Sequence, residues 1–362
     1  MEQELFAYWL YTLRGIGAKK RHELQQIYGN AEQIYYGDKT KLKESPVFSE
    51  QDKTLLGKPV KEIKHKMQRM EQRGIRFCSQ ESEAFPKKLR YIPDPPYALF
   101  YRGMLPDTDR PAIAIVGGRN AGYESREIAA GFGRQLAENG IAVVSGLARG
   151  IDISAQKGAL DIPGGKTYGV LGTGVDICYP REHIEQYMLM QRRGAVISEY
   201  APGSRGFRSN FARRNRIISG LSDGVLVIAA REGSGSLITA ECALEQGKEV
   251  FIVPGNILDP SYAGGNQLLK SGAAVVTDIQ DILDGLGAFW DINYSAQKKK
   301  NEVMLETAEK IVYAILGFDG IHISEIVAQT GFSVPQTMEV LASLEQKKLV
   351  NMVGQHYYAL KI

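Results

Sequence analysis

The sequence predicts an α/β protein whose central part, residues 74–288, is a doubly wound and mainly parallel sheet. Nine β-type runs alternate there with segments whose apolar residues recur at helical spacing. The runs are continuously apolar, as expected for strands that helices cover on both faces. Five of them end in short glycine-bearing loops, which lie at one edge of a parallel sheet. These observations are typical of a Rossmann-like domain. The runs are GIRFCS, YALFYRG, AIAIVG, IAVVSG, TYGVLG, GAVISE, GVLVIAA, EVFIVPG and AAVV.

The composition is that of an ordinary soluble protein with room for two or three domains. Its 362 residues are 44% hydrophobic and 23% charged, and the net charge is only +3. Binding to a nucleic acid would therefore depend on local clusters of basic residues. The three cysteines, Cys78, Cys178 and Cys242, have neither disulfide-framework nor zinc-site spacing. No apolar run is long enough for a membrane span, and we see no targeting signal, so we expect a cytoplasmic protein.

Residues 1–73 have apolar residues at helical spacing and predict a small helical domain, of the SAM (sterile α motif) or helix-hairpin-helix type. Within it, LRGIGAKKRHEL resembles a helix-hairpin-helix turn, in which Gly15 and Gly17 let backbone N–H groups approach a phosphate. Its basic residues are Lys19, Lys20 and Arg21. The alternative is that the two glycines only form a tight turn between helices.

A polar, lysine-rich linker is expected at residues 289–304, followed by a winged helix at residues 305–362. The order is one helix, a second at 324–329, a turn at Gly331, a third helix at 334–346 and a short hairpin through Gly354. The third helix carries two acids and few basic residues. A module for dimerisation or partner docking is therefore as good an interpretation as DNA reading.

The loops that follow the strands should form the ligand site. In an open parallel sheet, ligands bind beyond the carboxyl ends of the strands. Five glycine-bearing loops at that edge imply a shelf of accessible backbone, and GSGSLITAE runs straight into a helix whose first N–H groups can hold an anion. The loops are residues 117–120, 145–150, 172–174, 233–236 and 254–256.

Familiar nucleotide chemistry lacks its required residues. GSGSLIT has no lysine for the phosphates of an NTP, which argues against ATP hydrolysis. GGRNAG does not supply the GxGxxG fingerprint of a dinucleotide site, which argues against a dehydrogenase. The five histidines have no ligand spacing. We therefore expect no cofactor and no metal.

Basic and aromatic residues gather at the same edge. Arg119, Arg149 and Arg181 follow three of the strands, and SRGFRSNFARRNR contains no acid. Arginines neutralise phosphates and aromatic rings stack on unpaired bases, so this set predicts a site for a single strand. In the alternative interpretation Phe211 is a core residue and some arginines pair with Glu199, Glu232 and Glu241. The segment's arginines are Arg205, Arg208, Arg213, Arg214 and Arg216, and its rings are Phe207 and Phe211.

The chain resembles the DNA-processing protein A (DprA/Smf) family of bacteria. The matching stretches include FPKKLRYIPDPPYALFYRG, VVSGLARGID, VLGTGVDICYP, RRNRIISGLSDGVLVI, SGSLITAE and VFIVPG, between residues 85 and 283. The resemblance implies a cytoplasmic protein that binds single-stranded DNA, protects incoming DNA in natural transformation and helps the recombinase RecA to load. It implies no catalytic residues, and a homodimer through residues 268–276.

The site expected from the loops and the resemblance combines backbone, basic and aromatic groups. The departures from the family pattern are Gly118, Gln156, Ala212 and Ala229. The expected DNA-binding residues are Gly117, Gly118, Arg119, Ser145, Gly146, Arg181, Arg208, Phe211, Asn215, Arg216, Ser234, Gly235 and Ser236.

An enzyme is the alternative function. The fold also resembles that of the nucleoside-monophosphate phosphoribohydrolases of the lysine-decarboxylase-like family, which use an arginine after one strand and a glutamate inside a glycine-turn helix. Arg119 and Glu241 could form such a pair, with Glu241 stabilising positive charge on a ribose. That family's PGGxGTxxE signature is absent from the chain. Release of adenine from AMP would distinguish the two functions.

Overall fold

The computed structural model of the chain forms two compact units, Met1–Asp291 and Ile292–Ile362. The structure describes residues 2–13, 15–43, 45, 47–107, 110–287, 306–317, 320–347 and 349–360. The expected linker at 289–304 lies outside the described residues. Among the described residues, no helix is both long and apolar enough to cross a membrane.

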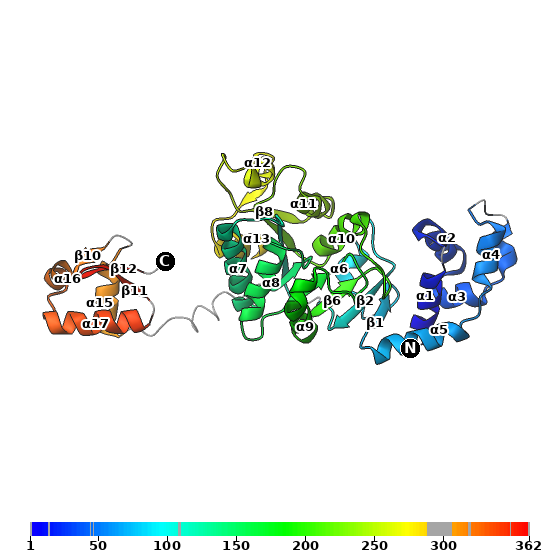
Figure 1. The fold of residues 1–362 in the computed structure, drawn as a ribbon, viewed down its shortest axis with the longest axis horizontal. Helices are drawn as coiled ribbons and strands as arrows, with labels where there is room; N and C mark the ends of the chain where they lie inside the picture. The colour runs from blue at the N-terminus through cyan, green and yellow to red at the C-terminus, as the bar shows by residue number, and fades with distance from the viewer. Residues whose placement is uncertain are drawn as a thin grey trace. The chain divides into compact units, whose positions relative to one another are not determined.

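A nine-stranded sheet forms the centre of the first unit, with strand order β1-β2-β6-β5-β4-β3-β7-β8-β9 (Figure 1). The seven strands from β6 to β9 in that order are parallel, and β1 and β2 are antiparallel additions at one edge. The predicted fold class is confirmed, and each predicted run contains a strand. The strands are Arg76–Ser79, Ala98–Gly103, Ala112–Gly117, Ala142–Ser145, Thr167–Val170, Ala195–Ser198, Gly224–Ile228, Glu249–Ile252 and Ala274–Val275.

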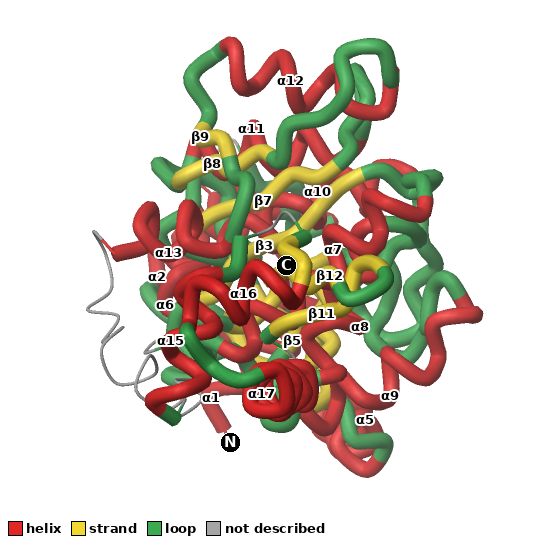
Figure 2. Tube along the Cα trace, turned by 90° about the vertical axis from the view of Figure 1, so that its left-hand side faces the viewer, coloured by secondary structure: helices red, strands yellow, loops and turns green. Residues whose placement is uncertain are grey.

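Helices cover both faces of this sheet, which explains why the strands are apolar on both sides (Figures 1 and 2). On one face, Ile217 of α10 and Ala240 of α11 pack in the same core as Val116 and Val227. On the other face, α8 and α9 contribute to a second core. The helices of this region are α6 (Lys87–Arg90), α7 (Tyr123–Glu138), α8 (Ile151–Asp161), α9 (Ile184–Arg193), α10 (Arg208–Gly220), α11 (Gly235–Glu245), α12 (Ala263–Lys270) and α13 (Ile279–Gly287).

The N-terminal helices share a core with the antiparallel edge of the sheet. Trp9 and Leu24 pack in one cluster with Phe77 of β1 and Phe100 of β2. Burial of these large side chains holds the helices on the sheet. The helices are α1 (Glu2–Thr12), α2 (Ala18–Tyr28), α3 (Ala31–Tyr36), α4 (Glu50–Leu56) and α5 (Lys61–Gln72).

The second unit has the order of elements that the sequence predicts. Three helices, α15 (Thr307–Ile315), α16 (Ile323–Thr330) and α17 (Val334–Gln346), are followed by a hairpin of β11 (Val350–Gly354) and β12 (Tyr357–Leu360). The short strand β10 (Ile321–His322) pairs with β12. Gly331 ends α16 in the left-handed conformation, as a helix C-cap requires.

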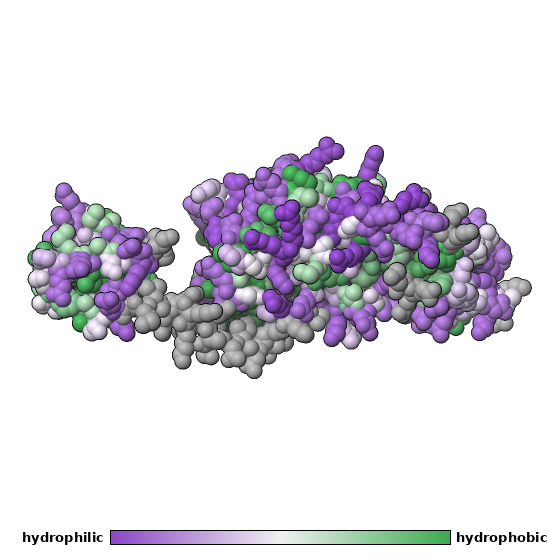
Figure 3. Space-filling model, turned by 90° about the horizontal axis from the view of Figure 1, so that it is seen from below, coloured by the Kyte–Doolittle hydropathy of each residue, from purple (hydrophilic) through white to green (hydrophobic). Residues whose placement is uncertain are grey.

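The surface seen in Figure 3 is mainly hydrophilic, and its apolar areas are small and separated. Scattered apolar areas of this kind are normal on one face of a protein surface.

The hydrogen bonds of the Glu309 carboxylate lead us to expect that the second unit loses stability in acid. It accepts hydrogen bonds from Lys347 Nζ at 2.6 Å, Ser343 Oγ at 2.6 Å and the Glu306 N–H at 2.7 Å. These bonds lower the pKa of Glu309 to about 2. Because the folded pKa lies below the unfolded one, the stabilisation is present above about pH 4.5 and is lost as the pH falls toward 2.

Glu309→Gln should therefore reduce the protection of the amides of α15 and α17 at neutral pH, and this difference from wild type should shrink as the solution is acidified. Amide hydrogen exchange on the full chain measures it, and the α8 amides are the internal control. A difference that stays constant between neutral and acid pH would contradict this role for Glu309.

Candidate nucleic-acid interface

The site lies where the direction of strand addition reverses, between β3 and β7. Strand β3 pairs with β4 on one side and with β7 on the other. The two loops beyond these strands touch through their backbones. The Gly118 N–H donates to the Ala229 carbonyl at 3.1 Å, and a Cβ on Gly117 would lie 2.0 Å from the Ile228 carbonyl oxygen. Glycine is needed here because any side chain at residue 117 would separate the strands.

The turn before α11 presents a helix N-terminus at this edge. Ser234 is the N-cap, and its hydroxyl accepts from the Ser236 N–H at 3.3 Å. Gly235 is exposed, with open space where a side chain would be. Asn215 of α10 donates its side-chain amide to the Gly235 carbonyl at 2.9 Å. Asn215 therefore fixes the turn through the Gly235 carbonyl, while the exposed backbone of Gly235 leaves the helix N-terminus accessible to an anion.

An aromatic pair is formed by Tyr179 and by Phe211, which lies one helical turn before Asn215 on α10. Phe211, in the first turns of α10, packs against the backbone of Gly172 and Gly206 and is half-buried. The Tyr179 ring lies 5.5 Å from the Phe211 ring between centroids. The Arg119 guanidinium lies 6.0 Å from the Phe211 centroid. Cations over a ring at this distance are attracted to its face.

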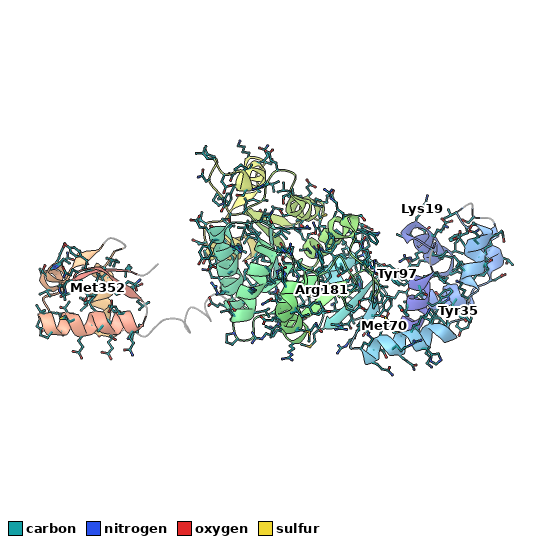
Figure 4. The ribbon with its side chains drawn as sticks, viewed as in Figure 1. Lys19, Tyr35, Met70, Tyr97, Arg181 and Met352 are labelled. Atoms are coloured by element: carbon teal, nitrogen blue, oxygen red, sulfur yellow. The ribbon has the colours of Figure 1, made fainter. Side chains whose placement is uncertain are left out.

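Three of the predicted cations are exposed around this pair: Arg119, Arg181 and Arg208. Arg208 is one helical turn before Phe211, so both lie on one side of α10. Arg181, labelled in Figure 4, begins a short 3-10 helix two residues after Tyr179. The structure therefore brings these basic and aromatic side chains to one region of the carboxyl edge.

Two other aromatic side chains of this region are more exposed to solvent than Phe211. Tyr179 is 54% exposed and Phe207, the N-cap of α10, is 65% exposed. Exposed rings beside guanidinium groups can stack on bases. Sequence reasoning used Arg181 but missed Tyr179. The available signal was an aromatic residue directly before Pro180 and Arg181, in a loop at the ligand-binding edge.

Several predicted contact residues are buried in the structure, which revises their expected role. The Ser145 hydroxyl donates to the Ile115 carbonyl, and the Gly146 N–H donates to Asp152. These hydrogen bonds hold the end of β4 to β3 and to α8. The buried members of the predicted set are Gly117, Ser145, Gly146, Asn215, Arg216 and Ser236.

Arg216 pairs with two acids. Its guanidinium lies 2.8 Å from Glu199 and 2.8 Å from Asp94. The pair with Glu199 is the one that the alternative interpretation of the arginines expected. Arg149, exposed on the loop after β4, is likewise paired, at 2.7 Å from Glu182.

Arg214 is the most deeply buried arginine of the segment. Its guanidinium donates to the carbonyl oxygens of Gly146 and Val170, at the ends of β4 and β5. Burial lowers the pKa of Arg214 to about 10, and attraction to the buried Asp152 opposes that shift. The group stays charged at neutral pH and ties α10 to the carboxyl edge.

Two departures from the family pattern have local explanations. Gln156 is buried, and its amide donates to the Tyr168 carbonyl at 3.1 Å, so it joins α8 to β5. Ala229 has a positive φ of 48° and its carbonyl accepts from the Gly118 N–H. The turn after β7 thus keeps its backbone contact without an acid at this position.

Known proteins resemble this chain over much of its length. The family model described as "DNA recombination-mediator protein A" matches residues 76–287. Protein Smf of Escherichia coli is 35% identical over 331 residues, covering 90% of this chain and 88% of the relative. DNA processing protein DprA of Bacillus subtilis is 39% identical over 217 residues, covering 59% of this chain and 72% of the relative.

Two solved structures share the fold. The X-ray structure of DprA from Streptococcus pneumoniae has a TM-score of 0.64 at 32% identity, covering 78% of this chain and 97% of that one. The Helicobacter pylori DprA structure, described by its single-stranded DNA binding mode, has a TM-score of 0.52 at 30% identity. It covers 59% of this chain and 96% of that one.

Replacing the buried Arg214 should unfold the site instead of weakening a contact. Arg214→Met leaves Asp152 buried with its charge partner removed and two carbonyls without their donor. We expect the free energy of unfolding to fall by about 3 kcal/mol. Urea denaturation measures this change, and Arg208→Ala, at an exposed position of the same helix, should stay close to wild type. Equal stability of the two variants would contradict the structural role of Arg214.

Proposed function

The chain belongs to the DNA recombination-mediator protein A family, and from this premise we propose that it binds single-stranded DNA at the carboxyl edge of its sheet. The observation that carries the proposal is the grouping of Arg119, Tyr179 and Phe211 at the carboxyl edge that also carries the open turn at Gly235. Cations and backbone N–H groups hold phosphates, and rings hold unpaired bases. A duplex offers no free base faces, so this combination favours a single strand.

The phosphate-binding turn at residues 234–236 would hold the strand without reacting with it. Gly235 offers backbone, and the Ser234 and Ser236 hydroxyls hydrogen-bond to each other at 2.7 Å. The family relationship supports a mediator that protects incoming DNA in the cytoplasm during natural transformation and passes it to RecA. In this role the protein lowers the free energy of the bound strand and makes no covalent change.

A homodimer through residues 268–276 completes the proposal. β9 is the last strand of the sheet in the order of hydrogen-bonded neighbours, and Val275 is 53% exposed on it. Leu268 and Leu269 of α12 are partly buried against the core, and Val276 is fully buried. The exposed part of this surface therefore consists of the turn at residues 270–272 and Val275 of β9.

The phosphoribohydrolase alternative is not favoured. Glu241, its proposed catalytic acid, is exposed on α11, and the PGGxGTxxE signature is missing. An exposed carboxylate in water is a weak stabiliser of developing positive charge. Incubation of the protein with AMP should release no adenine. Clear release of adenine would instead support the phosphoribohydrolase function.

Removal of a cation that holds a phosphate should change the salt dependence of binding. Arg119→Ala and Arg208→Ala should each lower affinity for oligo-dT and reduce the slope of log K against log salt by about 0.7. Fluorescence anisotropy at several salt concentrations measures both. Arg192→Ala, at an exposed position of the last turn of α9, is the matched control and should keep the wild-type slope. If all three variants bind as wild type does, the proposed cleft is wrong.

Tyr179 should contribute by stacking, which depends little on salt. Tyr179→Ala should weaken oligo-dT binding by about 1 to 3 kcal/mol without changing the salt slope. Tyr91→Ala is the matched control, because Tyr91 is 87% exposed and follows α6, which packs at the opposite end of α10. Titrations at two salt concentrations separate the two kinds of contact. A wild-type affinity for Tyr179→Ala would mean that this ring is not used.

A further inference from the structure

A groove of about 380 Å³ lies between the N-terminal helices and the sheet, outside the cleft described above. Its walls come from α1 and α2 on one side and from the segment after β6 and the middle of α10 on the other. Figure 4 labels Tyr97, one of its lining residues, and Lys19 of α2. The lining residues include Tyr11, Ala18, Arg21, Glu199, Tyr200 and Arg213.

Three arginines and three carboxylates lie in or directly behind this groove; the third carboxylate, Glu81, hydrogen-bonds to the lining residue Gln25. Arg216 contacts both Asp94 and Glu199 at 2.8 Å, and Arg213 lies 3.9 Å and 3.8 Å from the same two acids. Arg21 adds a third guanidinium, 4.9 Å from the centroid of the Tyr97 ring. Arg216 engages both acids at the shorter distance, and the Arg213 side chain is 52% exposed, so the Arg213 guanidinium can also meet an anionic ligand.

Helix α10 contributes residues to both the groove and the proposed DNA cleft. Arg208 faces the cleft, and Arg213 is five residues further on, about 7.5 Å along the helix axis. The Tyr200 hydroxyl donates to the Asn210 carbonyl at 3.4 Å, so a groove-lining ring is attached to the same two turns. Five residues also turn the helix by about 140°, so a strand lying across Arg208 and Phe211 reaches Arg213 by crossing over α10.

The wall from α2 is open at its N-terminal end. Gly17 and Ala18 are exposed groove residues, and a Cβ on Gly17 would meet nothing within 4 Å. By contrast, a Cβ on Gly15 would lie 3.6 Å from Leu55, so Gly15 faces other N-terminal helices. Lys20, expected to contact phosphate, is paired with Asp52 at 2.7 Å.

We propose that this groove is a second contact for the same single strand. Arg213 and the first turn of α2 hold a phosphate there, and the rings of Tyr11 and Tyr200 flank the adjoining nucleotide. The proposal rests on the proposed function, because the strand enters from the cleft. It gives the N-terminal helices a role in lengthening the binding site, through the groove instead of through the lysines of the turn.

An acid placed in the groove tests this idea without harming the fold. Ala18→Glu adds a negative charge in the first turn of α2, where the helix dipole tolerates an acid. Gln51→Glu adds the same charge in the first turn of α4, at an exposed position outside the groove, and is the matched control. Thermal melts of both variants establish that they are folded.

The readout is affinity for oligo-dT of increasing length. On oligomers too short to leave the cleft, both variants should bind as wild type does. On longer oligomers, Ala18→Glu should bind about tenfold more weakly, with a salt slope smaller by about 0.7 for each phosphate that the groove no longer holds. Gln51→Glu should show neither change. Identical length dependence in all three proteins would overturn the second contact.

The experiment also distinguishes failure of the proposed function from failure of the second contact. If wild type fails to bind even the short oligomers, the proposed function itself fails, whatever the variants do. If Ala18→Glu weakens binding of thymidine monophosphate and leaves the length dependence unchanged, the groove is a site for a free nucleotide and the strand proposal is wrong.

Discussion

The carboxyl edge depends on the buried guanidinium of Arg214. It donates to carbonyls at the ends of two neighbouring strands and faces the buried Asp152. This one side chain fixes the N-terminal half of α10 over β4 and β5, and α10 carries Arg208, Phe211 and Asn215. A buried charge is costly unless it is partnered, so the partners are needed as much as the arginine. A Cβ at Gly146 would lie 2.5 Å from this guanidinium, which explains the glycine there.

The site therefore has an inner and an outer layer. Inner groups, such as Ser145 and Arg216, have protein partners and set the positions of loops and helices. Outer groups, such as Arg119, Arg208 and Tyr179, have exposed side chains and are free to meet a strand. Both layers use arginine, because its planar fork satisfies two acceptors in the interior and its permanent charge attracts phosphate at the surface.

Much of the fold could be predicted from the sequence, because strands of a parallel sheet that is buried on both faces have continuously apolar sequences. The edge holding the site followed from the same pattern. The roles of neighbouring arginines could not be predicted in this way. Arg213 and Arg214 are adjacent, yet Arg213 is exposed and Arg214 is fully buried. The face of the helix on which each residue lies, and its partners distant in the sequence, determine this difference. Asp94 and Asp152 are such partners, and no local motif connects them to SRGFRSNFARRNR.

The chemistry of the outer layer also explains why binding would be reversible. Its cations are exposed to water, where each phosphate contact is weak and screened by salt. Its anion turn offers neutral backbone, held by the amide of Asn215. The buried acid nearest the turns, Asp152, accepts from the Gly146 N–H, and burial raises its pKa. Its carboxylate is thus occupied in positioning a loop, and in the proposed complex a strand would be held by many modest contacts that can be released one after another.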